Sequence, residues 1–258
     1  MNEKTNEKAE ILSWGKIEKK HEEFLKKEPR ECAYEIAKEC IDKYWREGEI
    51  SDKDLEKITE SVLTFLLVWN SPLYRNCSLK KGFIKKIKGR IKNNKKKLDN
   101  FRGKCICELN TSDKNNIKDL YESFLEVLAC EKNIGNTKLH NEEKSQGVDQ
   151  GAKEEKENKK YSPVSTAKFL HIICPNFFPL WDKTIADRYG CSYKNGKDSF
   201  ESYWEYMVKV KEQVDNLKDP ETEEIKEILK KYTILKLIDE YNYMSYIKGE
   251  QAIGMVKI

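Results

Sequence analysis

The chain has 258 residues, of which 38% are hydrophobic and 36% are charged, and its formal net charge is +4. This length allows one large domain or two small ones with a buried core, and the hydrophobic content is too high for a disordered chain. No run of residues approaches the roughly 18 consecutive apolar positions of a membrane span. With a polar N-terminus unlike a secretory signal, these features predict a soluble, cytoplasmic protein without membrane contact.

Apolar residues at helical spacing predict helices along most of the chain, and no strand pattern is strong enough to build a sheet. In the first part we expect helices at 5–28 and 30–47, then a third that begins after Ser51 and ends before Pro72. Ser51 is a suitable N-cap because an acidic first turn follows it. The sequence therefore predicts an all-α fold.

The segment 80–104 has a composition of its own. It contains ten lysines and two arginines against one aspartate, a local charge of +11, so the remaining residues sum to −7. Its apolar residues recur at near-helical spacing, which predicts an amphipathic helix that presents Lys85, Lys86, Arg90 and Lys97 outward. A strongly basic helix on an otherwise acidic protein is typical of nucleic-acid binding through phosphate contacts. A solvated helix face is the structural alternative.

Beyond this segment, Ser112 and Asp113 open another predicted helix. We therefore expect an N-terminal helical region at 1–130, a flexible linker at 131–160, where apolar periodicity is lost, and a C-terminal helical region at 161–258. Both helical regions are expected to share one body around a cleft.

Eight cysteines and three histidines are present, and no two cysteines have C-x-x-C spacing. The spacing therefore gives no support for a metal site, and we expect no cofactor. Cys105 and Cys107 are the one close pair. An intracellular chain of this length needs no disulfide framework, so ordinary reduced thiols are expected.

The stretch 162–190, SPVSTAKFLHIICPNFFPLWDKTIADRYG, is the most hydrophobic part of the chain. Ser165 or Thr166 can cap a buried helix that begins at Ala167, within which His171 is expected to be a hydrogen-bonded core residue. An irregular apolar crossing then leads to Asp182, an acceptable N-cap for a short helix that ends near Gly190.

This order resembles the core of the helix-hairpin-helix DNA glycosylase superfamily. Thr166-Ala167 matches the start of the helix after the family's hairpin, and Asp182 matches the catalytic aspartate at the start of the next helix. The resemblance covers about residues 161–190. It implies a compact multi-helix fold that binds double-stranded DNA and hydrolyses the N-glycosidic bond of a flipped-out base, with Asp182 as the catalytic carboxylate.

The sequence departs from the family pattern in three places. The hairpin segment YSPVS has no glycine, no lysine stands just before Thr166-Ala167, and the four-cysteine iron–sulfur loop is missing. The resemblance therefore implies a monofunctional enzyme without lyase chemistry. The candidate residues for base stacking or the pocket are Trp181, Phe177, Phe178, Trp69 and Tyr74. The candidates for nucleic-acid contacts are Lys85, Lys86, Arg90, Lys97, Ser165 and Thr166.

Other functions stay open at this point. Asp182 can be a helix cap alone, with the aromatic residues as core. The chain is then a non-catalytic helical nucleic-acid-binding module, or an interaction module whose lysine-rich segment binds an acidic protein.

Overall fold

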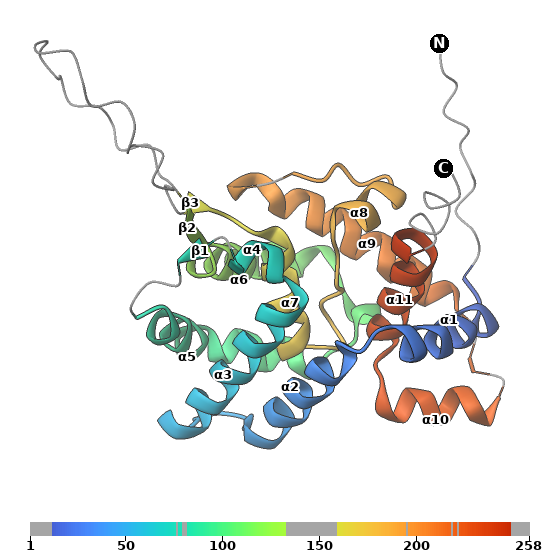
Figure 1. Ribbon diagram of the computed structural model, residues 1–258, viewed down its shortest axis with the longest axis horizontal. Helices are drawn as coiled ribbons and strands as arrows, with labels where there is room; N and C mark the ends of the chain where they lie inside the picture. Colours follow the sequence, from blue (N-terminus) through green and yellow to red (C-terminus); the bar gives the residue numbers. More distant parts are fainter. Residues whose placement is uncertain are drawn as a thin grey trace, which may run out of the picture.

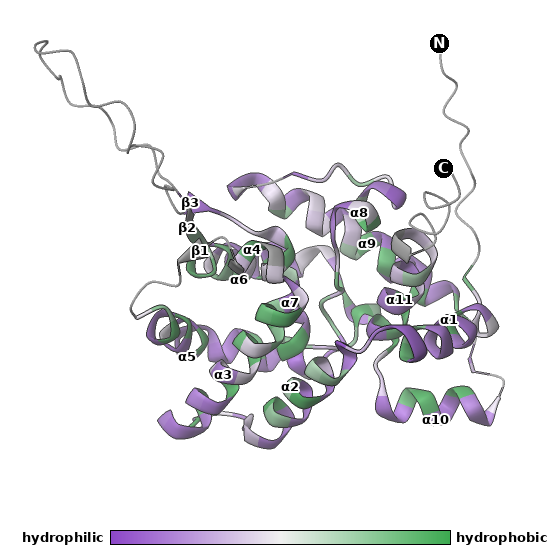
Figure 2. Ribbon diagram, in the orientation of Figure 1, coloured by the Kyte–Doolittle hydropathy of each residue, from purple (hydrophilic) through white to green (hydrophobic). Residues whose placement is uncertain are grey.

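The computed structural model describes residues 12–75, 77–78, 82–132, 159–194, 196–217, 219–220 and 222–248. These residues are predominantly helical, which confirms the all-α prediction (Figure 1). Most helices have a hydrophobic and a hydrophilic side (Figure 2), as expected of helices that bury one face against a common core. The closer similarity to the glycosylase fold stays a prediction.

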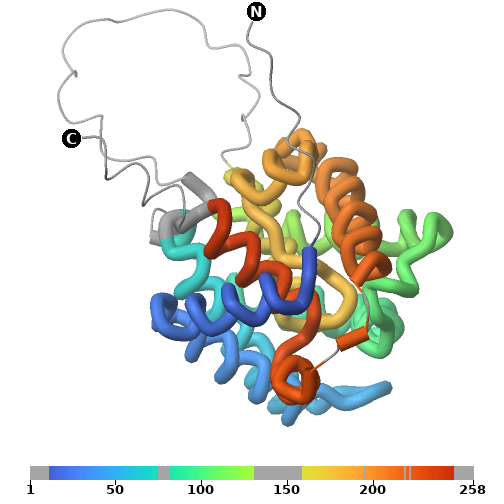
Figure 3. Tube along the Cα trace, turned by 90° about the vertical axis from the view of Figure 1, so that its right-hand side faces the viewer, coloured from blue at the N-terminus to red at the C-terminus, as the bar shows by residue number. Residues whose placement is uncertain are grey.

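Four helices form the N-terminal part: α1 (Trp14–Lys27), α2 (Glu31–Tyr44), α3 (Asp52–Trp69) and α4 (Ser71–Arg75). The side chain of Ser51 accepts a hydrogen bond from the backbone amide of Asp54 at 3.1 Å, which confirms the predicted N-cap of α3. Helices α2 and α3 pack against each other. Helix α1 packs along α11 (Ile234–Asn242), the dark blue and red helices of Figure 3, so the two ends of the described chain meet.

The basic segment forms α5 (Phe83–Arg102), which packs between α3 and α6 (Lys114–Val127). Two short 3₁₀ helices, η1 (Ile106–Glu108) and η2 (Thr111–Asp113), connect α5 to α6. The predicted amphipathic character of this helix is confirmed, because its apolar residues are buried. They are Phe83, Ile87, Ile91, Leu98 and Phe101.

The structure also contains a small antiparallel sheet, although no strand pattern in the sequence was strong enough to predict one. It has the order β1-β2-β3, with β1 (Cys77–Ser78), β2 (Cys130–Lys132) and β3 (Lys159–Lys160). Cys77 lies opposite Lys132, and Cys130 lies opposite Lys160. Strands of two or three residues are too short for an alternating pattern, so only the tertiary structure brings them together.

Helix α7 (Pro163–Ile173) begins four residues before the expected start at Ala167. Ser162 is its N-cap, with a side chain that accepts a hydrogen bond from the amide of Ser165 at 3.1 Å. Pro163 then occupies the first helical position, where its missing N–H is not needed. The prediction that Ser165 or Thr166 caps this helix is therefore wrong. In the described chain, strand β3 directly precedes α7.

An irregular crossing leads from α7 to α8 (Lys183–Arg188), as predicted. The C-terminal part then contains η3 (Lys197–Ser199), α9 (Phe200–Asn216), α10 (Glu223–Lys231), α11 and the π-helical turn η4 (Tyr243–Lys248). Thr233 separates α10 from α11, because its side chain accepts a hydrogen bond from the amide of Lys236 and starts a new helix.

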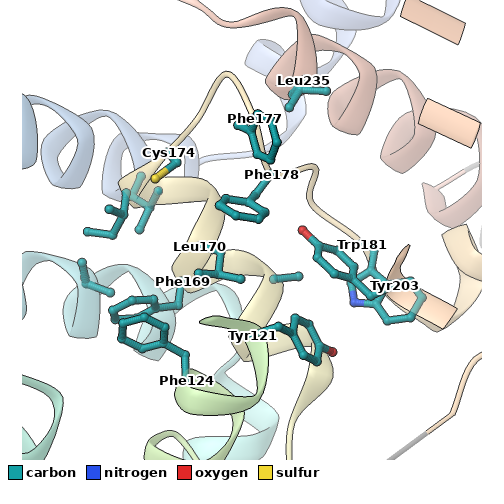
Figure 4. Close-up of a cluster of buried hydrophobic side chains, with 14 of the residues drawn as sticks. Tyr121, Phe124, Phe169, Leu170, Cys174, Phe177, Phe178, Trp181, Tyr203 and Leu235 are labelled. Atoms are coloured by element: carbon teal, nitrogen blue, oxygen red, sulfur yellow. The ribbon is translucent and has the colours of Figure 1, made fainter. Parts of the chain in front are cut away.

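The hydrophobic core contains residues from both predicted helical regions. Helices α2, α3 and α6 of the first region pack against α7 of the second. Phe124 of α6 stacks on Phe169 of α7 with ring centroids 4.2 Å apart (Figure 4). Phe101 of α5 packs on Phe177 of the crossing. Most of the predicted linker, residues 133–158, lies outside the described residues, while the two ends of 131–160 belong to β2 and β3.

The cysteines differ from the sequence expectation. Cys105 and Cys107 form a disulfide, and Cys130 is also disulfide-bonded, so the prediction of reduced thiols is wrong at these positions. Cys174 and Cys191 are buried thiols. Among the described helices, none combines the length and hydropathy that crossing a membrane requires.

Candidate nucleic-acid interface

A groove of about 600 Å³ lies between the first half of α5 and the end of α6, where the chain enters β2. Lys85, Lys86 and Arg90, three of the predicted phosphate-binding residues, line this groove together. Gly89 and Asn93 lie on the same wall, one helical turn apart, and neither was among the predicted residues. A set of predicted residues thus shares one concave surface.

The local sequence of α5 explains why these residues face the groove. Phe83, Ile87 and Ile91 recur at every fourth position and are buried, so the positions between them point away from the core. Lys85 and Lys86 are exposed. Arg90 is half-buried, and its guanidinium donates a hydrogen bond to the hydroxyl of Ser123 on α6 at 3.3 Å, which holds it at the wall of the groove.

Ion pairs divide the basic segment into two unlike halves. From Lys92 onward, most cations lie beside a carboxylate from α2, α3, α5, η2 or α6. These pairs are Lys92–Asp52, Lys95–Asp99, Lys97–Asp119, Arg102–Asp42 and Lys104–Asp113. In the first half, no carboxylate of the described residues pairs with Lys85, Lys86, Lys88 or Arg90. The uncompensated positive charge of the helix is therefore concentrated at the groove.

Lys97, the fourth predicted cation, does not line the groove. Its ammonium lies 3.0 Å from the carboxylate of Asp119 on α6. An exposed pair of this kind contributes little to stability, yet it offsets the charge that a phosphate would meet. The structure therefore separates Lys97 from the other three cations.

The groove has one acidic residue on its lining, Glu126, and this carboxylate is already engaged. Lys159 of β3 donates a hydrogen bond to Glu126 at 2.6 Å, and this contact lowers the pKa of the carboxyl group. The rest of that wall is formed by Val127, Ala129 and Cys130. The groove thus has a cationic wall and a largely apolar wall.

Asp182 is the N-cap of α8, as predicted. One of its carboxylate oxygens accepts a hydrogen bond from the amide of Ile185 at 2.9 Å, and the side chain is half-buried. Asp182 does not line the groove of α5, and Figure 1 shows α8 well separated from α5. The predicted catalytic acid and the predicted phosphate-binding cations are therefore in different places.

Two further charged groups lie close enough to Asp182 to interact with it electrostatically, Lys168 of α7 and Asp239 of α11. The ammonium of Lys168 donates a hydrogen bond to the backbone carbonyl of Trp69 at 2.6 Å. Burial lowers the pKa of Lys168 to about 8 and raises the pKa of Asp239 to about 7. Lys168 and Asp239 were not among the predicted site residues, although a lysine inside the apolar helix 163–173 was a signal.

The five predicted pocket aromatics are mostly core residues. Trp181, Phe177 and Phe178 are at most 1% exposed, and Tyr74 is also buried. Trp181 packs against Tyr203 and Tyr206, with ring centroids 5.3 and 5.8 Å away (Figure 4 shows the first of these contacts). Trp69 is half-buried and lies beside Lys168. Of the five aromatic candidates, Trp69 is therefore the one that is not buried in the core, and it contacts Lys168.

Ser165 and Thr166 are fully buried, so the geometry does not support phosphate contacts by their hydroxyl groups. The hydroxyl of Thr166 donates to the carbonyl of Ser162 at 3.1 Å, and Ser165 accepts a hydrogen bond from the side-chain amide of Asn70. His171 is a satisfied core histidine, as predicted. Its Nδ1 lies 2.8 Å from the carbonyl of Phe178, and burial lowers its pKa to about 3.

No protein-family model, curated protein or solved structure matches this chain. Within the described ranges, no group of three or more histidine, cysteine or acidic side chains is arranged to hold a metal ion.

Proposed function

We propose that the protein binds nucleic acid through the groove beside the first half of α5. The observation that carries this proposal is that Lys85, Lys86 and Arg90 line one groove without a carboxylate partner among the described residues. Such cations attract a phosphate backbone and release its condensed counterions on binding. The second half of the helix contributes less, because its cations already lie beside carboxylates.

Fluorescence anisotropy of a labelled DNA at several salt concentrations tests this proposal. Each lost phosphate contact reduces the slope of log K against log salt by about one, so Lys85→Ala combined with Lys86→Ala is expected to weaken binding and reduce the slope by about two. Lys19→Ala combined with Lys53→Ala removes two exposed lysines from α1 and α3 and is the matched control. Equal affinity of the two double variants for DNA would contradict the groove as the binding site. Binding to an acidic protein but to no nucleic acid would favour the interaction module instead.

Monofunctional DNA glycosylase activity is the second candidate. It is favoured by Asp182, which uses one carboxylate oxygen for the cap while its half-buried side chain is attracted by Lys168 and repelled by Asp239. An anion held in this way can stabilise the positive charge that develops on the sugar when the base leaves.

A panel of duplexes with damaged bases, followed by alkali to cleave abasic sites, tests the second candidate. Asp182→Asn keeps a side-chain oxygen for the cap and removes the charge. Strand breaks with the unmodified protein and none with Asp182→Asn are the expected result. Absence of breaks across the panel, or equal breaks in the variant, contradicts the catalytic role while leaving binding at the groove intact.

A further inference from the structure

Gly89 occupies a position in α5 that neither packing nor backbone geometry explains. It lies well inside a 20-residue helix, where glycine is less favourable than alanine. Apart from its chain neighbours and the backbone of its own helix, a Cβ atom at Gly89 would meet no atom of the described residues within 4 Å, and the φ of Gly89 lies outside the left-handed region that favours glycine. The protein on its own would therefore accommodate alanine at this position.

The surroundings of Gly89 connect it to the groove. Lys85 lies one helical turn before it and Asn93 one turn after it, so the three share one face of α5 and all line the groove. Gly89 thus leaves bare backbone between a cation and an amide, and such a site allows a ligand to approach closely.

The size of the groove indicates which kind of nucleic acid it can hold. Its volume of about 600 Å³ falls within the range of roughly 300–1,000 Å³ that encloses a drug-sized ligand, which suits one or two nucleotides. The major groove of a duplex alone is about 12 Å wide, and the whole duplex is wider still. A duplex is therefore too large to enter the groove of the protein and can only lie across its rim. A single strand can enter.

The different chemistry of the two walls also favours a single strand. Unpaired nucleic acid offers phosphates together with exposed base faces, and proteins bind it with cations and apolar or aromatic surface side by side. Lys85, Lys86 and Arg90 form the cationic wall, while Val127 and Ala129 belong to the apolar one. A duplex keeps its base faces stacked and would leave the apolar wall uncovered.

We propose that the groove holds an unpaired strand of nucleic acid whose backbone passes over Gly89. This inference rests on the proposed function, and it replaces the duplex that the sequence predicts with a single strand as the preferred ligand.

The test compares a labelled 12-nucleotide single-stranded DNA with a duplex of the same length, bound to the full chain at low salt. We expect the single strand to bind at least tenfold more tightly. Gly89→Ala should raise the midpoint of thermal unfolding, since alanine favours the helix, and weaken single-strand binding about tenfold without a change in duplex binding. Gly15→Ala is the matched control, because Gly15 is also a helical glycine with open space around it but lies in α1, outside the groove.

The outcomes separate this inference from the function on which it rests. If the duplex binds as tightly as the single strand, the single strand is not the preferred ligand. If Gly89→Ala binds the single strand with unchanged affinity, the nucleic-acid backbone does not pass over Gly89. In both cases Lys85 and Lys86 can still be required for binding. Failure of the unmodified protein to bind either DNA contradicts the proposed function itself.

Discussion

Lys236 on α11 donates a hydrogen bond to Glu31 on α2 at 2.8 Å, across a separation of 205 residues, and both side chains are almost completely buried. The same ammonium donates to Glu240 at 2.8 Å, and Glu240 also contacts His21 of α1. Lys236 further lies 4.4 Å from the ring centroid of Phe24. A buried ionic cluster therefore connects α11 to α1 and α2.

Replacing the cation of this cluster is expected to be costly. Lys236→Met leaves two buried carboxylates without their cation, and breaking a buried ion pair in this way lowers the free energy of unfolding by about 3–5 kcal/mol. Lys226→Met is the control, because the pair between Lys226 and Glu223 is exposed and should contribute less than about 1 kcal/mol. Urea unfolding measures both. A loss of less than 1 kcal/mol for Lys236→Met contradicts the assigned cluster.

The pH dependence of stability should reflect the raised pKa values of Asp239 and Glu31. Burial raises the pKa of Asp239 from 3.8 to about 7, and burial raises the pKa of Glu31 from 4.5 to about 7 against the influence of Lys236. The folded state then binds more protons than the unfolded state, so these groups reduce stability as the pH rises from about 4 to 7.

The measurement is urea unfolding across this pH range. Asp239→Asn cannot titrate, so its free energy of unfolding should fall less steeply than that of the unmodified protein between pH 4 and 7. Parallel curves for the two proteins would show that Asp239 titrates normally in the folded state.

Lys168 should change the free energy of unfolding in the opposite direction at higher pH. Burial lowers its pKa from 10.5 to about 8, so the unfolded state binds more protons between these values and stability rises with pH across this window. Lys168→Met should remove this rise. A rise of the same size in Lys168→Met would assign it to another group.

Because α7 starts at Pro163, the side chain of Ser162 is expected to contribute to stability as the N-cap. Because the side chain of Ser162 caps the helix, Ser162→Ala should lower the free energy of unfolding by about 1 kcal/mol. Ser61→Ala is the control, since Ser61 lies inside α3 and its hydroxyl donates a hydrogen bond to the carbonyl of Lys57 within the same helix. Equal stability of both variants by urea unfolding would place the start of the helix elsewhere.

The cap made by Asp182 can be separated from its charge. Asparagine is as good an N-cap as aspartate, so Asp182→Asn should stay within about 0.5 kcal/mol of the unmodified protein, whereas Asp182→Ala should lose about 1 kcal/mol. Thermal and urea unfolding measure the difference. A large loss in Asp182→Asn would mean that the charge itself stabilises the fold, and the catalytic test with this variant would then need the folded fraction as a correction.

The sequence by itself determined the features that depend on residues near one another in the chain. Apolar spacing predicted the buried face of α5, Ser51 and its acidic turn predicted the start of α3, and the apolar surroundings of His171 predicted a core histidine. Helix formation, capping and helical amphipathicity are local properties, so a linear pattern contains them.

Only the tertiary structure decided which charged groups meet. The local count of +11 did not distinguish Lys85 from Lys97, because the partner of Lys97 is on α6, and Lys236 stands in an ordinary helical sequence until α2 folds against it. The short strands and the burial of Ser165 likewise depend on segments far apart in the sequence. Charge pairing and burial are set by distances in space, and the order of residues in the chain does not specify those distances.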